Sequence, residues 1–160
     1  MAGKQHTYSV SVTWTGNTGS GTSRYNSYSR DYTVASPGKP DIAGSSDPAF
    51  RGDPKRYNPE DLLVVALSSC HMLSYLHLAA VGSVVVTNYV DDAGGVMTQD
   101  AKGSGAFTRV TLRPKVTITA DSDPAKARDL HHAAHEVCFI ANSVNFPVDC
   151  EPEIVVAPAA

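Results

Sequence analysis

The stretch that decides the fold reads NPEDLLVVALSSCHMLSYLHLAAVG and covers residues 58–82. Asn58 is a good N-cap residue, because its side chain accepts hydrogen bonds from the free amides of a first helical turn. Pro59 suits the first helical position, and the two carboxylates that follow it favour the positive end of the helix dipole. Gly82 is typical of a helix end. The sequence therefore predicts one long helix from Pro59 to about Val81.

Apolar residues cover nearly every side of this helix, a pattern that predicts a central helix buried by other elements. Its apolar run is interrupted by polar side chains, which are Ser68, Ser69, His71, Ser74 and His77. These interruptions favour a buried helix over a membrane span. We expect His71 and His77 to lie at the helix edges as ordinary polar residues.

The residues before the helix predict a hairpin and then a long irregular segment. Residues 8–15 alternate between apolar and polar side chains, which is the period of a half-buried strand. A glycine-rich turn separates them from residues 25–35, where a second strand is expected. Residues 36–57 contain four prolines and three glycines, and we expect an irregular segment of the kind that often carries function.

The residues after the helix predict more strands around a second helix. The expected ranges are residues 84–89, 95–99 and 106–119 for strands, 123–141 for the helix and 149–156 for a closing strand. We therefore predict a single α+β domain over residues 1–160, with antiparallel strands wrapped on two long helices.

The composition limits the partners and the compartment that we expect. The chain has 160 residues, 18% charged and 42% hydrophobic, which suits one globular domain. Its formal net charge of −3 argues against a nucleic-acid partner, because phosphate binding needs a net basic face. We expect no signal peptide and no membrane span, and three cysteines fit a secreted disulfide scaffold poorly. These observations favour a cytoplasmic protein.

Two cysteines carry the candidate chemistry. Cys70 lies within the first helix and Cys138 near the end of the second. If the helices pack together, the thiols meet in the core, where a reducing compartment favours redox or metal chemistry over structural cross-links. At about 100° per residue, Cys138 falls between the apolar face of its helix and the side that holds His131 and His135. A small hydrophobic filler is the alternative role for this cysteine.

These residues resemble a known family. The run from Asn58 to Leu63, followed by Cys70-His71-Met72, is similar to the NPE…C signature of the OsmC/Ohr peroxidases. The run from Cys138 to Ser143 lies where that family has its second cysteine. Phe139 stands where many members have proline, and with residues 45–53 it indicates a divergent branch. The resemblance implies an OsmC-like α+β fold, with antiparallel sheets wrapped around two central helices in an intertwined homodimer.

The resemblance also implies a reaction, the thiol-dependent reduction of organic hydroperoxides to alcohols. Apolar residues close to the cysteines in sequence predict an apolar pocket near Cys70, which favours alkyl or lipid hydroperoxides; they are Leu67, Leu73, Phe139 and Ile140. Cys70 would attack the peroxide as a thiolate and become a sulfenic acid, and Cys138 would convert it to a disulfide before over-oxidation. In the family, an arginine after the first strand contacts the thiolate and pairs with the glutamate that Glu60 matches. We expect Arg30 in this role because it adjoins the second strand, with Arg24 as the alternative.

Helix geometry separates Glu60 from Cys70, because ten residues of continuous helix span about 15 Å. Either the helix breaks or Glu60 serves a site on a partner chain, and we expect the second in a homodimer. The other expected partners are an organic hydroperoxide and a dithiol reductant, for which the family suggests a dihydrolipoyl protein. We expect no cofactor.

Two other functions stay open. One is a non-catalytic OsmC-like scaffold that binds a ligand or acts in stress. The other is metal binding, because His131, His135 and Cys138 follow one side of a helix and Cys70 offers a fourth zinc ligand. The sequence has no compact metal-binding motif, so we expect no metal site. Cys150 has neither a cation nor a partner in the sequence pattern, and we expect it to be a bystander.

Overall fold

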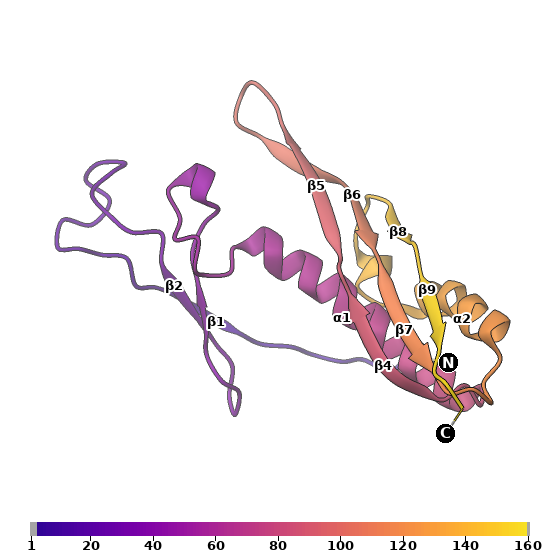
Figure 1. The fold of residues 1–160 in the computed structure, drawn as a ribbon. Coiled ribbons are helices and arrows are strands. Elements are labelled where there is room, and N and C mark those ends of the chain that lie inside the picture. The colour runs from indigo at the N-terminus through magenta and orange to yellow at the C-terminus, as the bar shows by residue number, and fades with distance from the viewer. Residues whose placement is uncertain (1–2, 160) are drawn as a thin grey trace. The chain divides into compact units, whose positions relative to one another are not determined.

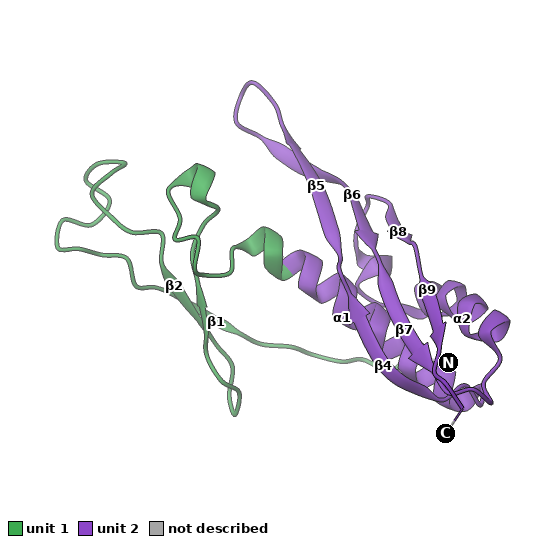
Figure 2. Ribbon diagram, in the orientation of Figure 1, with its two compact units in different colours: residues 1–62 green, residues 63–160 purple. Residues whose placement is uncertain are grey.

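Two compact units make up the chain in the computed structural model, which describes residues 3–159. One unit comprises residues 1–62 and the other residues 63–160 (Figure 2). The single domain that we expect over the whole chain stays a prediction.

The first unit contains a three-stranded antiparallel sheet in the order β1-β2-β3. Strands β1 (Ser11–Trp14) and β2 (Tyr32–Ala35) form the expected hairpin, but both are shorter than predicted because a long loop separates them. Strand β3 (Ile42–Gly44) lies in the segment predicted to be irregular, and its three residues are too few to show a period. The register pairs Ser11 with Ala35 and Tyr32 with Gly44. The 3-10 turn η1 (Pro48–Phe50) follows.

Helix α1 (Pro59–Val81) has the predicted bounds. The Asp61 amide donates to Asn58 Oδ1 at 2.7 Å, and the Asn58 amide donates to Asp61 Oδ2 at 3.2 Å. This reciprocal capping box satisfies two amides that a helix start leaves free. By length and composition the helix could cross a membrane, which is weak evidence because the core helix of a soluble protein passes the same test.

The burial predicted for α1 and for the first strand is wrong within the single chain. The buried residues of α1 form one stripe with a spacing of four, which is Leu67, His71, Tyr75 and Ala79. On other sides of the helix, Val65 is 50% exposed and Leu73 is 63% exposed. All four residues of β1 are also exposed. The chain by itself therefore covers only one face of α1 and neither face of β1.

Two three-stranded sheets and a second helix belong to the other unit (Figure 1). The strands are β4 (Val86–Asp91), β5 (Gly94–Gln99), β6 (Gly105–Leu112), β7 (Pro114–Ile118), β8 (Val148–Cys150) and β9 (Glu153–Val156). The sheets have the orders β4-β7-β9 and β5-β6-β8. Strands β4 and β7 pair antiparallel, as do β5 and β6, whereas β8 and β9 join in parallel. The α+β class is confirmed, with mixed sheets.

The strand predicted over residues 106–119 is two strands, with a break at Arg113. The Arg113 amide donates to Asp91 Oδ1 at 2.6 Å, and Asp91 Oδ2 accepts from Ser68 Oγ at 2.5 Å. Asp91 therefore satisfies the backbone amide where the chain leaves one sheet and enters the other.

Helix α2 (Pro124–Val137) begins where predicted and ends four residues before Ala141. Asp123 caps its start by accepting from two amides of the first turn. Cys138 is the C-cap residue, in an extended conformation with φ −73° and ψ 106°. Its amide donates to the His135 carbonyl, three residues earlier, which tightens the last turn. Residues 138–140 leave the helix, and the 3-10 turn η2 (Ala141–Ser143) begins at the last residue of the predicted helix.

The second unit has two hydrophobic cores. The larger core joins α1, α2 and β7, and its buried residues include Tyr75, Ala79, Val116, Ile118, Ala127 and Ala134. In Figure 1, α1 passes behind β4 and β7, in keeping with this packing. The smaller core joins α1 to β6 through Leu67, Val110 and Leu112. Packing in the larger core holds the two helices together.

Candidate functional site

The thiols of Cys70 and Cys138 come together in the second unit. Cys70 lies in the middle of α1 and is half-buried, whereas Cys138 caps α2 with an exposed fraction of 1%. The Cys70 thiol is close enough to Cys138 to affect the pKa of its thiol, and both cysteines are free. The meeting of thiols that the sequence predicted for packed helices is therefore present.

The surroundings of Cys138 favour its protonated form. Burial raises the pKa of the Cys138 thiol to about 11, and the neighbouring Cys70 thiol contributes in the same direction. The backbone amides of Ala141 and Ile140 act in the opposite direction, because they favour the thiolate. At neutral pH this thiol is therefore protonated.

The apolar residues predicted near Cys70 divide into two groups. Leu67 is fully buried in the smaller core, and Ile140 packs against that core. Leu73 and Phe139 are instead 63% and 74% exposed. The environment of the thiol pair is therefore apolar on the side of the smaller core.

Glu60 lies in the first turn of α1, which is continuous from Pro59 to Val81. One of the two alternatives stated for Glu60 was a break in this helix, and the helix does not break. Glu60 is thus about 15 Å along the helix axis from Cys70 of its own chain.

Arg30 lies in the first unit and is held by its own loop. Its guanidinium donates to the Tyr28 carbonyl at 2.8 Å and to the Tyr25 carbonyl at 2.7 Å. The same group lies over both rings, 4.1 Å from the Tyr28 centroid and 4.5 Å from the Tyr25 centroid. Arg24, the alternative, is in the same loop and uses its backbone amide to bind Ser27 Oγ at 3.1 Å. The loop aromatics, rather than strand β2, fix the Arg30 side chain.

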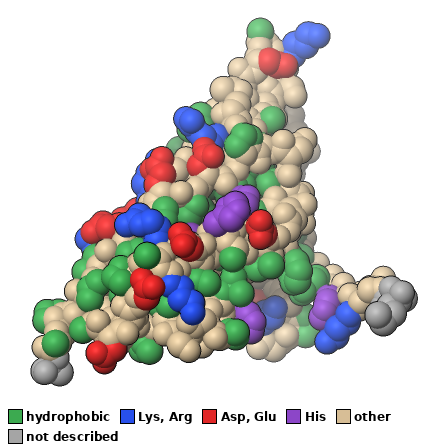
Figure 3. All heavy atoms as spheres, turned by 90° about the vertical axis from the view of Figure 1, so that its right-hand side faces the viewer, with side chains coloured by type: hydrophobic (Ala, Val, Ile, Leu, Met, Phe, Trp, Pro, Cys, Tyr) green, Lys and Arg blue, Asp and Glu red, His purple; other side chains and the backbone are tan. Residues whose placement is uncertain are grey.

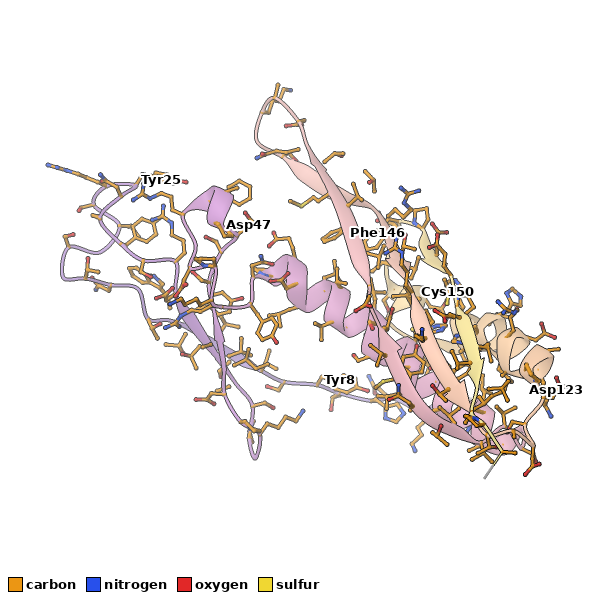
Figure 4. All side chains as sticks on the ribbon, in the orientation of Figure 1. Tyr8, Tyr25, Asp47, Asp123, Phe146 and Cys150 are labelled. Atoms are coloured by element: carbon orange, nitrogen blue, oxygen red, sulfur yellow. The ribbon has the colours of Figure 1, made fainter. Side chains whose placement is uncertain are left out.

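The metal ligands considered from the sequence are not brought together as one set. His131 lies beside His71 of α1 and Cys150 of β8. Figure 4 labels Cys150 in the second unit. His71 Nε2 is 3.0 Å from His131 Nδ1, and the Cys150 sulfur is 3.6 Å and 3.9 Å from these two nitrogens. Cys150 therefore has two partners, which the sequence pattern did not show, and its expected role as a bystander stays a prediction.

His71 and His131 are buried, with exposed fractions of 1% and 3%. The expectation that His71 lies at a helix edge is therefore wrong. Burial lowers the pKa of His131 to about 3 and also lowers the pKa of His71, so both imidazoles are neutral at physiological pH. Burial, with smaller contributions from Asp91 and Glu151, raises the pKa of Cys150 to about 12.

Sequence reasoning missed this cluster because its members are far apart in the chain. His71 is 60 residues from His131 and 79 residues from Cys150. The one available signal was the spacing of four from Leu67 through His71 to Tyr75, which puts the imidazole in the apolar stripe of α1.

The molecular surface mixes charges. On the face drawn in Figure 3, acidic and basic side chains are interspersed, with histidines among them. This distribution matches the small net charge of −3.

Comparison with known proteins connects the chain to the predicted family. The family described as OsmC-like protein matches residues 52–153. A curated relative, the organic hydroperoxide resistance protein OhrB of Bacillus subtilis, is 29% identical over 97 residues, which cover 61% of this chain and 68% of that protein.

Solved structures have the same fold. An OsmC-like protein of unknown function from Vibrio cholerae superposes with a TM-score of 0.83 at 37% identity, covering 92% of this chain and 99% of that one. An organic hydroperoxide resistance protein from Elizabethkingia anophelis gives a TM-score of 0.67 at 18% identity, covering 96% and 100%. The second likeness shows the fold alone. With its helices, sheets and cysteines in this arrangement and most of its length matched, the chain belongs to the OsmC-like protein family, which includes proteins named for organic hydroperoxide resistance.

Proposed function

We propose that this chain is a thiol peroxidase that reduces organic hydroperoxides, with Cys70 as nucleophile and Cys138 as resolving thiol. The observation that carries the proposal is the proximity of these two free thiols, with Cys70 in the middle of α1 and Cys138 at the end of α2. The relative named for organic hydroperoxide resistance supports the substrate class.

The unequal burial of the two thiols supports their order of action. Cys70 is half-buried and open to a substrate, whereas Cys138 is 1% exposed and protonated at neutral pH. The Cys70 thiolate attacks one peroxide oxygen, the O–O bond breaks, and the alkoxide takes a proton to leave as an alcohol. Cys70 becomes a sulfenic acid in this step.

The second half of the cycle uses Cys138. Its sulfur attacks the Cys70 sulfenic acid, a disulfide forms and water leaves. The backbone amides of Ala141 and Ile140 stabilise the negative charge that develops on Cys138 as its proton departs. A dithiol reductant, in the family a dihydrolipoyl protein, then returns both cysteines to thiols by exchange.

Activation of Cys70 requires a cation, because a free thiol is mostly protonated at neutral pH. We assign this role to Arg30, and we assign to Glu60 the task of orienting that arginine. The continuity of α1 separates Glu60 from Cys70 of the same chain, which supports a homodimer in which Glu60 serves the partner's site.

The substrate class follows from the surroundings of the thiols. Leu67 and Ile140 provide an apolar wall beside the pair, which favours alkyl or lipid hydroperoxides over hydrogen peroxide. The three free cysteines suit a reducing compartment, so we propose a cytoplasmic location.

The test is to add cumene hydroperoxide to the reduced protein and to map its thiols by mass spectrometry. We expect a loss of two hydrogens in a species that links Cys70 to Cys138, with Cys150 unmodified as an internal control. The Cys138→Ser variant should accumulate a sulfenic acid at Cys70 that dimedone traps, because the resolving thiol is absent. The Cys70→Ser variant should not consume peroxide.

Two outcomes would contradict the proposal. One is a wild-type protein that does not react, which would favour the non-catalytic scaffold. The other is a Cys70→Ser variant that reacts at the wild-type rate, which would move the chemistry to another residue. A second-order rate constant that is higher for hydrogen peroxide than for cumene hydroperoxide would contradict the substrate class alone.

A further inference from the structure

We propose that His71, His131 and Cys150 form a metal site, and that zinc(II) is the cation their donor set fits. The site is separate from the Cys70–Cys138 pair and does not rest on the proposed peroxidase function. Its three side chains come from three elements, α1, α2 and β8, and their ligand atoms all lie within 4.8 Å of one another.

The spacing of the ligand atoms matches a tetrahedral zinc site. Zn–N bonds of about 2.05 Å and a Zn–S bond of about 2.3 Å put tetrahedral ligands about 3.3 Å apart for N–N and about 3.6 Å apart for S–N. The observed separations are 3.0 Å between His71 Nε2 and His131 Nδ1, and 3.6 Å and 3.9 Å from the Cys150 sulfur. Each ligand atom has to shift by only a few tenths of an ångström to reach the separations of a tetrahedral zinc site.

The unpartnered ring nitrogens of the two histidines suit coordination. Metal binding through the facing nitrogens needs the ring protons on His71 Nδ1 and His131 Nε2. Within the described residues neither of these buried atoms has a hydrogen-bond partner. No neighbouring donor therefore prevents either atom from carrying the ring proton.

The charges around the cluster favour a cation over a free thiolate. The carboxylates of Asp91 and Glu151 act on Cys150, and Asp91 also favours positive charge at His71. Arg128 acts against positive charge at His131, and His135 does so at His71. A bound zinc ion removes the thiol proton outright and gains from the nearby carboxylates.

A pocket gives the cluster access to solvent. It has a volume of about 340 Å³, and its walls include His131, Cys150, Arg128 and His135. Three protein ligands with an open side are typical of zinc sites that keep a fourth position for water or another ligand. His135 lines the same pocket and is a candidate for that position.

The experiment measures metal binding to reduced, metal-free protein. Titration with zinc against a chromophoric chelator should give one tight site per chain. Cobalt(II) in place of zinc should produce a thiolate-to-cobalt charge-transfer absorption, because Cys150 supplies a sulfur ligand. The Cys150→Ser and His131→Ala variants should bind zinc roughly 100-fold or more weakly, since even partners of metal ligands are worth 10–100-fold.

Cys138→Ser is the matched control, because it removes a buried thiol outside the proposed site, and it should retain both the affinity and the cobalt spectrum. The proposal is overturned by the absence of a tight site in the wild type, by a wild-type cobalt complex without thiolate absorption, or by unchanged affinity in Cys150→Ser. The cobalt spectrum needs no variant, so the test remains decisive if a substitution prevents folding.

Discussion

Cys138 differs from an ordinary cysteine because the end of α2 buries its sulfur. Its pKa is raised to about 11, so near neutral pH the folded protein has roughly a hundredfold less thiolate at this position than an unperturbed thiol. We expect iodoacetamide to modify Cys138 at least that much more slowly in the folded protein than in the urea-unfolded chain. Peptide mapping by mass spectrometry after timed quenching measures this rate.

The same shift has a consequence for stability. The folded state holds the Cys138 proton more tightly than the unfolded state, because the folded pKa is the higher one. The stabilisation is fully present below the unfolded pKa and is lost as the pH rises from that value toward about 11.

Equal alkylation rates of Cys138 by iodoacetamide in the folded and unfolded chains would contradict the burial of this thiol.

At the scale of the element, α1 offers a matched pair of leucines. Leu67 is fully buried, whereas Leu73 on the same helix is 63% exposed. We expect Leu67→Ala to lower the free energy of unfolding by about 3 kcal/mol, because it leaves a cavity in the smaller core. Leu73→Ala should cost less than about 1 kcal/mol. Urea unfolding followed by circular dichroism compares the two variants.

The Leu73→Ala control also tests whether a partner covers this face of α1. A loss for Leu73→Ala as large as that for Leu67→Ala would mean that something outside the single chain covers the Leu73 face. A dependence of that loss on protein concentration would identify a second copy as the cover, because subunit association then contributes to stability.

The helices show which features local sequence predicts. Both bounds of α1 were predicted, because Asn58, Pro59 and Gly82 act on their own helix. The end of α2 was placed too late, because the turn at Cys138 has no glycine or proline to mark it. The break at Arg113 was missed because it depends on Asp91, 22 residues away.

One part of the candidate site was predicted from the sequence and another part was not. The Cys70–Cys138 pair was predicted because two helix patterns and a family signature both pointed to it. The contact of His71 with His131 and Cys150 was not predicted, because it exists only after α1, α2 and β8 have packed. Local sequence patterns predict where helices begin, whereas tertiary packing decides which buried polar groups meet.

At the scale of the whole molecule, several large apolar side chains stay exposed in the single chain. They include Val12, Trp14, Val65 and Leu73. Exposed apolar surface of this kind is a reason to expect a partner, and the proposed homodimer supplies one.

Mixing two inactive variants tests whether Glu60 serves the partner's Cys70. In a heterodimer of Glu60→Gln and Cys70→Ser chains, one site combines an intact Cys70 with an intact Glu60 from the other chain. Random exchange of equal amounts makes half of the dimers mixed, so roughly a quarter of the wild-type peroxidase activity should return. Each variant alone, taken through the same exchange, is the control. If Glu60 serves its own chain, mixed dimers contain no complete site and stay inactive. Full activity in a wild-type monomer would also exclude the shared site.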